Sequence, residues 1–480
     1  MNLTTKTVKS TVWSTAGLIA DQTINLVRLA ILARLLSSED FGLYAMAMVF
    51  FMFLMTAGDL GTSAAIVQRK QTSQTLLSTV FYLNLVFGLV FMSLVLLIAP
   101  VVGSFYGEIK VVDLMRWMSV LFLMTAVGFV HSALMRKTMN FKRLTIAKNT
   151  ANLIASVICI YLAWRGFGYL SFAVQLVAQA SLTTILITTL YRWKPSLKFS
   201  IPDLKQIFKY SANLTGFNFI EYIAANSDKF LVGKLLGSAA MGAYYIAFRL
   251  VLMPLEQINA VVNTVIFSTL SVVQEEQQRF EKIFLKLIYL ISCFSAPFTL
   301  FFCATADLTT LVMFGDKWGS AASVLAILAP AGLVRAVTSP TGIICMVKDR
   351  TEVLLKLSLI GMFVIPLCVF IGLQWGLNGA AAGFTVASFI MVLPVLMSTL
   401  RIADISIPKV LRAVATPICV AFLCASCMYT AKILWLSHTS IPAVLQLLIL
   451  ILGGSTVYLL IIGTRLIREI QQFREGDHSL

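Results

Sequence analysis

The sequence predicts an all-α polytopic membrane protein with about 14 transmembrane helices, arranged as two pseudo-symmetric six-helix lobes plus two extra C-terminal helices. Of the 480 residues, 59% are hydrophobic and only 12% are charged, whereas an ordinary soluble domain has roughly 25% charged residues. The mean hydropathy is +0.89. Apolar runs of about 20 residues, long enough to cross a ~30 Å hydrocarbon core, follow one another along the chain.

An internal repeat divides these runs into two halves. Residues 31–47 read ILARLLSSEDFGLYAMA, and residues 231–247 read LVGKLLGSAAMGAYYIA. The two segments align without a gap, and the identical pairs are Leu35 and Leu235, Leu36 and Leu236, Ser38 and Ser238, Gly42 and Gly242, Tyr44 and Tyr244, and Ala47 and Ala247. Each copy joins the end of one apolar run to the start of the next. An internal repeat indicates that the chain is built from equivalent parts, so the predicted spans are divided into two halves, each containing one copy.

The first half contains six apolar runs separated by polar or glycine-containing breaks such as SSED, QRKQTSQ and YGE. Its predicted spans are 12–33, 42–67, 77–105, 112–135, 146–164 and 169–191. The longest polar connector, RWKPSLKFSIPDLK, follows and carries two prolines. It therefore marks the boundary between the halves.

The second half repeats the pattern of six and then adds two runs. Its predicted spans are 207–236, 242–270, 283–306, 319–337, 353–374, 377–400, 410–435 and 441–465. An even number of spans per half gives both halves the same orientation, so a parallel repeat is expected. The predicted regions are an N-terminal lobe (1–191), a cytoplasmic linker (192–206), a C-terminal lobe (207–400), two additional spans (401–465) and a cytoplasmic tail (466–480).

The net charge of +16 follows membrane topology and does not indicate nucleic-acid binding. Lysine and arginine gather in alternate loops, such as 136–143 and 192–209, while the opposite loops carry mostly single cations. The positive-inside rule then places both termini in the cytoplasm. No basic stripe with interleaved aromatic residues is present, so we expect no nucleic-acid partner.

With the repeat and the spans in place, the chain resembles the Wzx-type polysaccharide flippases of the multidrug/oligosaccharidyl-lipid/polysaccharide exporter superfamily, and the colanic acid exporter branch in particular. The resemblance rests on TVWS at 11–14, LARLLSSEDFGLYAMA at 32–47, GDLGTSAAIVQRK at 58–70, LMRKTMNFKR at 134–143 and FGDKW at 314–318. It implies export of an undecaprenyl-diphosphate-linked oligosaccharide repeat unit across the bacterial inner membrane, for exopolysaccharide, capsule or O-antigen (lipopolysaccharide) assembly. The expected mechanism is alternating access without ATP hydrolysis.

Polar stripes in two symmetry-related spans are the candidate site. Charged groups at membrane depth cost roughly 2.5–3.5 kcal/mol each, so they are functional candidates. Asp21, Asn25 and Arg28 share one helical face. The seventh span carries a similar stripe, and Asp21 falls on Glu221 under the repeat. The members of the second stripe and its neighbours are Asn218, Glu221, Tyr222, Asn226, Asp228 and Lys229. Both stripes are predicted to face the cavity between the lobes.

The implied cargo suggests a role for each group. A diphosphate needs cations, and arginine can hold its oxygens bidentately. The in-span candidates are Arg28, Lys229, Arg249 and Arg335. Amide and aromatic groups of Gln22, Asn25, Asn218, Tyr222 and Asn226 could contact sugars, and Asp21, Glu221 and Asp228 could pair with the cations or carry a coupling ion. A purely structural pairing of Asp21 with Arg28, or of Asp228 with Lys229, is the alternative.

Two other function classes compete with a flippase. A drug/ion antiporter of the same superfamily should have a cavity dominated by carboxylates, whereas this chain also brings cations into its spans. A membrane-embedded polysaccharide polymerase should have a large outer loop with catalytic residues, and every predicted outer loop is short. The scattered histidines and cysteines predict no catalytic site, metal or cofactor. Expected partners are the lipid-linked oligosaccharide and the bilayer, with a polymerase and a chain-length regulator as candidates.

Overall fold

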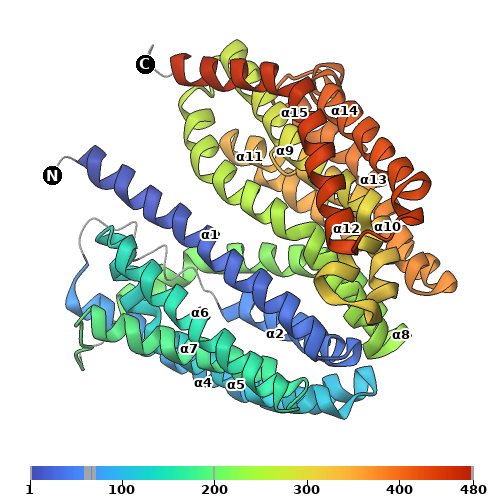
Figure 1. The fold of residues 1–480 in the computed structure, drawn as a ribbon. Coiled ribbons are helices and arrows are strands. Elements are labelled where there is room, and N and C mark those ends of the chain that lie inside the picture. The colour runs from blue at the N-terminus through green and yellow to red at the C-terminus, as the bar shows by residue number, and fades with distance from the viewer. Residues whose placement is uncertain (1–2, 59–65, 67–71, 198–199, 477–480) are drawn as a thin grey trace. The chain divides into compact units, whose positions relative to one another are not determined.

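The computed structural model describes residues 3–58, 66, 72–197 and 200–476, without the side chains of 3–12, 201–218, 254–266, 268, 437 and 466–476. All regular structure in this part of the chain is helical, which confirms the predicted all-α class (Figure 1). The helices are α1 (Leu3–Leu35), α2 (Ser38–Gly58), α4 (Gln74–Tyr106), α5 (Ile109–Lys137), α6 (Phe141–Trp164), α7 (Leu170–Leu190), α8 (Ile201–Val272), α9 (Gln277–Phe314), α10 (Gly319–Thr338), α11 (Thr341–Val347), α12 (Thr351–Gly372), α13 (Gly376–Ile402), α14 (Ile407–Leu434) and α15 (Ala443–Gly476). Three short 3-10 helices, η1 (Asp316–Trp318), η2 (Leu373–Trp375) and η3 (Leu436–His438), connect some of them.

Among the described residues, 12 helical stretches are long and apolar enough to cross a membrane. The chain is therefore a multi-pass membrane protein, as predicted. The number is smaller than fourteen because two predicted pairs each fall within one stretch: 207–236 and 242–270 lie in α8, and 353–374 and 377–400 lie in α12 and α13, which η2 joins. The predicted second span, 42–67, extends beyond the end of α2 into residues outside the described part. Fourteen crossings remain a prediction.

The chain divides into two compact units, Met1–Gly242 and Ala243–Leu480. In the first unit, α5 packs against α2, α4 and α7, and α1 packs along α6 (Figure 1). In the second unit, α9 packs against α10, α14 and α15, while α13 contacts α10 and α12. The predicted lobes, 1–191 and 207–400, have different boundaries and remain a prediction.

Each copy of the repeat joins two helical segments, but the two connections have different chemistry. In the first copy, the Asp40 carboxylate accepts hydrogen bonds from the hydroxyl (2.7 Å) and backbone N–H (3.0 Å) of Ser37, and the Asp40 N–H donates to the Ser37 hydroxyl (3.1 Å). This reciprocal arrangement satisfies the free N–H groups at the start of α2. In the second copy, Gly237 adopts φ 79° and ψ −177° inside α8. Because only glycine enters this region without strain, Gly237 replaces the capping residues and divides α8 into two helical segments.

Within the first unit, the two copies of the repeat meet backbone to backbone. A methyl group built on Gly42 would overlap with the carbonyl of Ser238, and one built on Gly242 would overlap with the carbonyl of Ser38. The contact is thus reciprocal, as the pairing of Gly42 with Gly242 and of Ser38 with Ser238 in the repeat would suggest. Both glycines serve close approach of two backbones, which leaves no space for a side chain.

We expect Gly42→Ala to destabilise the protein by roughly 1–3 kcal/mol, because the new methyl group overpacks a contact formed by rigid backbone. Thermal unfolding of the purified protein in detergent measures the effect. Gly453→Ala in α15 is the matched control, since a methyl group there meets open space. Equal melting temperatures for the Gly42→Ala variant and the wild type would contradict the close approach.

Candidate functional site

The polar stripe of α1 contacts α6 mainly through a buried amide, Asn152. The Asn152 side chain is 0% exposed, and its amide nitrogen donates to Asp21 Oδ1 (2.6 Å) and Asn25 Oδ1 (3.2 Å). Its amide oxygen accepts from Arg28 Nη1 (3.2 Å) and from the Ser156 hydroxyl (3.3 Å). Asn152 therefore connects all three residues of the predicted first stripe.

Both charges in this network have neutral partners among the described residues. Arg28 also donates to the Ser156 hydroxyl (3.2 Å), and the Asp21 carboxylate accepts a second amide from Asn25 (3.0 Å). In this part of the chain, Asp21 and Arg28 are bridged by Asn152 and form no direct ion pair. Amide and hydroxyl dipoles hold the two ions in place without neutralising them, so each remains able to attract a charged ligand.

We expect Asn152→Ala to lower stability by about 1–3 kcal/mol, because it leaves buried polar groups of Asp21, Asn25 and Arg28 without their shared partner. Asn149→Ala is the matched control on the same helix, since Asn149 makes one hydrogen bond across to α1, to the Gly17 carbonyl (3.0 Å). Melting temperatures in detergent should fall further for Asn152→Ala than for Asn149→Ala. The reverse order would show that Asn152 does not hold the network together.

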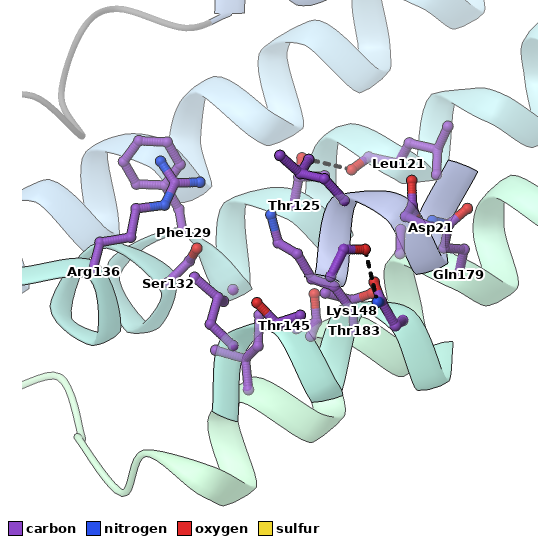
Figure 2. A pocket seen from close by; sticks show the side chains of 18 of the residues that line it. Asp21, Leu121, Thr125, Phe129, Ser132, Arg136, Thr145, Lys148, Gln179 and Thr183 are labelled. Atoms are coloured by element: carbon purple, nitrogen blue, oxygen red, sulfur yellow. Dashed lines mark hydrogen bonds between the residues drawn. The ribbon is translucent and has the colours of Figure 1, made fainter. Parts of the chain in front are cut away.

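A cavity of about 730 Å³ lies next to this network, enclosed by α1, α5, α6 and α7. This volume is within the range of ligand sites, roughly 300–1,000 Å³. Figure 2 shows that polar side chains from all four helices line it. They are Ser14, Asp21, Thr125, Ser132, Arg136, Thr145, Lys148, Asn149, Gln179, Thr183 and Thr184.

Two cations, Arg136 on α5 and Lys148 on α6, give the cavity a positive character. Both side chains are exposed. Among the described residues, neither cation forms a hydrogen bond or an ion pair. The cavity also contains Asp21, whose two oxygens are held by amides. An anion that entered the cavity would therefore meet two available cations.

Sequence reasoning missed Arg136, Lys148 and Asn152. Arg136 lies in the predicted basic loop 136–143. Lys148 falls inside the predicted span 146–164, but it follows that loop so closely that its charge is counted with the loop. Asn149, Asn152 and Ser156 follow the spacing i, i+3 and i+7, the same spacing that identifies a polar face on a helix. That pattern, applied to the fifth span, would have indicated a polar face on α6, although not the helix that it contacts.

The second predicted stripe is less uniform than the first. Tyr222 donates its hydroxyl to the Val49 carbonyl on α2 (2.7 Å), Asn226 donates to the Tyr222 carbonyl (3.0 Å), and Lys229 donates to Asn226 Oδ1 (2.7 Å). Glu221 is exposed, whereas Asp228 is 0% exposed. The side chain of Asn218 lies outside the described residues. The stripe thus turns part of its polar surface toward α2.

The remaining candidates are Gln22 in the first unit and Arg249 and Arg335 in the second unit. The Gln22 Oε1 atom on α1 is buried and has no hydrogen-bond partner among the described residues. Arg335 on α10 lies over the rings of Phe248 (5.8 Å) and Phe384 (5.2 Å), which are 5.1 Å apart. Arg249 follows Phe248 on α8 in the same second unit. A cavity shared by Arg28 and Lys229 of the first unit and these two arginines remains a prediction.

The described part of the chain contains no group of three or more histidine, cysteine, aspartate or glutamate residues that could hold a metal ion. The cysteines described there are free thiols. The cavity lining combines two cations with amide and hydroxyl groups, which are hydrogen-bonding partners for an anionic or polar ligand.

The chain is similar to known proteins of polysaccharide biosynthesis. A family model described as "Polysaccharide biosynthesis protein" matches residues 31–323, more than half of the chain. The chain is 26% identical over 413 residues to the lipopolysaccharide biosynthesis protein WzxC of Escherichia coli (strain K12), with 84% of each chain covered. It is 28% identical over 326 residues to the succinoglycan biosynthesis transport protein ExoT of Rhizobium meliloti (strain 1021), covering 68% of this chain and 66% of that one.

A solved structure with the same fold is that of the lipid II flippase MurJ in an inward closed conformation. The two superpose with a TM-score of 0.75 at 16% identity, over 96% of this chain and 99% of the other. The TM-score shows that the two proteins share a fold, and at an identity this low the comparison concerns the fold alone.

Proposed function

Because this chain belongs to the polysaccharide biosynthesis protein family, of Wzx-like transporters in the multidrug/oligosaccharidyl-lipid/polysaccharide exporter superfamily, we propose that it translocates undecaprenyl-diphosphate-linked oligosaccharide repeat units. The family is one of transporters and not of enzymes. The proposed location is the bacterial inner membrane, with both termini in the cytoplasm, and the units would supply exopolysaccharide, capsule or O-antigen assembly. The two halves would alternate access to the two membrane faces, with fourteen spans in two six-helix lobes plus two.

The observation that carries the proposal is the pair of available cations within membrane-spanning helices. Arg136 and Lys148 line a cavity whose volume suits a ligand. Arg136 lies in the last turn of α5 and Lys148 lies early in α6, so both cations lie toward the membrane boundary, where they can attract an anionic ligand. A diphosphate supplies several acceptor oxygens and a matching negative charge. In this proposal, Lys148 and Arg136 hold the diphosphate, and Arg28, which does not line the cavity, adds positive charge from the adjoining network with Asn152 and Ser156.

The amides and hydroxyls of the cavity suit the sugar. The same cavity is lined by amide and hydroxyl side chains that carry hydrogen-bond donors and acceptors. They belong to Asn149, Gln179, Thr145, Thr183 and Thr184. Sugar hydroxyls need such partners when they leave water, because an unpaired polar group in an apolar setting is costly. A drug/ion antiporter is the alternative function, and it would use Asp21 without needing the two cations.

Deletion of the gene tests the proposal. We expect the lipid-linked repeat unit to accumulate on the cytoplasmic face of the inner membrane and surface polysaccharide to be lost, with both restored by the wild-type chain. Normal polysaccharide export in the deletion strain, together with sensitivity to cationic drugs, would favour the antiporter instead.

A further inference from the structure

A second pocket of about 200 Å³ lies between α2, α4 and α5, and its walls are mainly apolar, with four phenylalanines. They include Met55, Phe87, Phe91, Phe122 and Phe129. The two polar side chains in its lining hydrogen-bond to their own helices: Asn84 donates to the Val80 carbonyl (2.8 Å) and Thr125 to the Leu121 carbonyl (2.7 Å). The pocket therefore offers an apolar surface.

This apolar pocket adjoins the cationic cavity. Thr125 and Phe129 on α5 line both of them. Arg136 lies eleven residues beyond Thr125 on the same helix, which is roughly 16 Å at the rise of an α-helix. One end of this bundle thus presents cations, and the adjoining region nearer the middle of the helices presents aromatic rings.

We propose that the aromatic pocket binds an isoprene unit near the diphosphate end of a polyprenyl diphosphate, with its diphosphate in the cationic cavity. The proposal rests on the proposed function and specifies how that substrate is held. The order of the two regions matches the order of the ligand: charge at the membrane boundary, then hydrocarbon toward the bilayer middle. A cavity of ~150 Å³ with apolar walls holds benzene, so 200 Å³ accommodates a five-carbon unit.

The shape of the pocket favours a flat, branched unit over a flexible acyl chain. Phe91 and Phe122 are stacked, with ring centroids 5.4 Å apart and planes 14° from parallel. A trisubstituted double bond is planar and can lie against such rings. Because a chain leaving the bilayer gains little from another apolar environment, shape and direction must provide the selectivity. The pocket therefore acts by aligning the chain so that its diphosphate reaches Lys148 and Arg136.

Photo-crosslinking on the full chain in native-lipid nanodiscs tests this placement. A benzophenone amino acid replaces Phe91, which lines the pocket, or its neighbour Val90, which is 53% exposed and faces away from the pocket. The probe is radiolabelled undecaprenyl diphosphate. We expect the adduct at position 91 to exceed that at position 90 by at least fivefold and to be displaced by unlabelled undecaprenyl diphosphate. A benzophenone at Met55 on α2 gives a second reporter in case the Phe91 variant does not fold.

Two further measurements separate this inference from the proposed function. Binding of undecaprenyl diphosphate that depends on Lys148, with no excess adduct at positions 91 and 55, would overturn the pocket assignment and leave the flippase proposal standing. In the second measurement, a photoreactive phosphatidylglycerol could label position 91 equally well without being displaced by undecaprenyl diphosphate. That result would identify the occupant of the pocket as an ordinary bilayer lipid and would also overturn the pocket assignment. Absence of any binding by the wild type would overturn the proposed function itself.

Discussion

Replacing Lys148 and Arg136 with alanine should abolish polysaccharide export while leaving the protein folded. Each cation would contribute a charge-assisted hydrogen bond to the diphosphate, and the loss of one costs about 1.5–3 kcal/mol, or roughly 10- to 100-fold in binding. The double variant should therefore export at background levels in a flippase-deficient strain. Because no described group pairs with either cation, their removal should leave the melting temperature unchanged or raised.

Arg143→Ala is the matched control for these two cations. Arg143 is an exposed cation on α6, seven residues after Arg136 in sequence and five before Lys148, and it does not line the cavity. Its removal should leave export within twofold of the wild type. If Arg143→Ala and the double variant reduce export equally, the effect reflects the basic loop or membrane insertion, and the cavity is not the binding site.

Arg28→Ala should reduce export roughly 10- to 100-fold, because the first-span stripe would lose its only cation. The melting temperature of this variant should rise or stay constant. Removing an arginine from membrane depth relieves about 2.5–3.5 kcal/mol of insertion cost, while Asn152 keeps its bonds to Asp21, Asn25 and Ser156. Export assays and melting temperatures of the same variant therefore distinguish a transport role from a structural one.

Thr23→Ala on α1 is the control for Arg28, since the exposed Thr23 hydroxyl bonds only to the Ile19 carbonyl of its own helix among the described residues. A large fall in melting temperature for Arg28→Ala, with export reduced in proportion to the folded protein, would assign Arg28 to the α1–α6 contact alone.

Composition and periodicity predict the fold of this chain well because they act within one helix at a time. Apolar length identifies each membrane helix, and the repeat around Gly42 and Gly242 identifies the two equivalent turns. Likewise, Asp21, Asn25 and Arg28 can be placed on one face from spacing alone. The number of spans is harder to establish, because short helical connections such as η2 join consecutive helices into one stretch even where the sequence has the break QWGLNG.

The partner of a polar face cannot be read from its own periodicity. The sequence predicts that the α1 stripe faces a cavity between lobes, and the structure places Asn152 and Ser156 of α6 against it. Lys148 is ambiguous for another reason: a lysine within the first two turns of a span can extend to the membrane boundary or point inward. Only the packing of α1, α5, α6 and α7 decides that it lines a cavity.

The central claim is that the chain moves a polyprenyl-diphosphate-linked sugar and holds its diphosphate with the cations of the cavity. The most direct test is translocation in proteoliposomes, using a fluorescent undecaprenyl-diphosphate-linked oligosaccharide and a membrane-impermeant quencher. The account predicts translocation by the wild type and by Arg143→Ala, and none above empty liposomes by the Lys148→Ala, Arg136→Ala double variant. Translocation at the wild-type rate by the double variant, or none by the wild type, would contradict it.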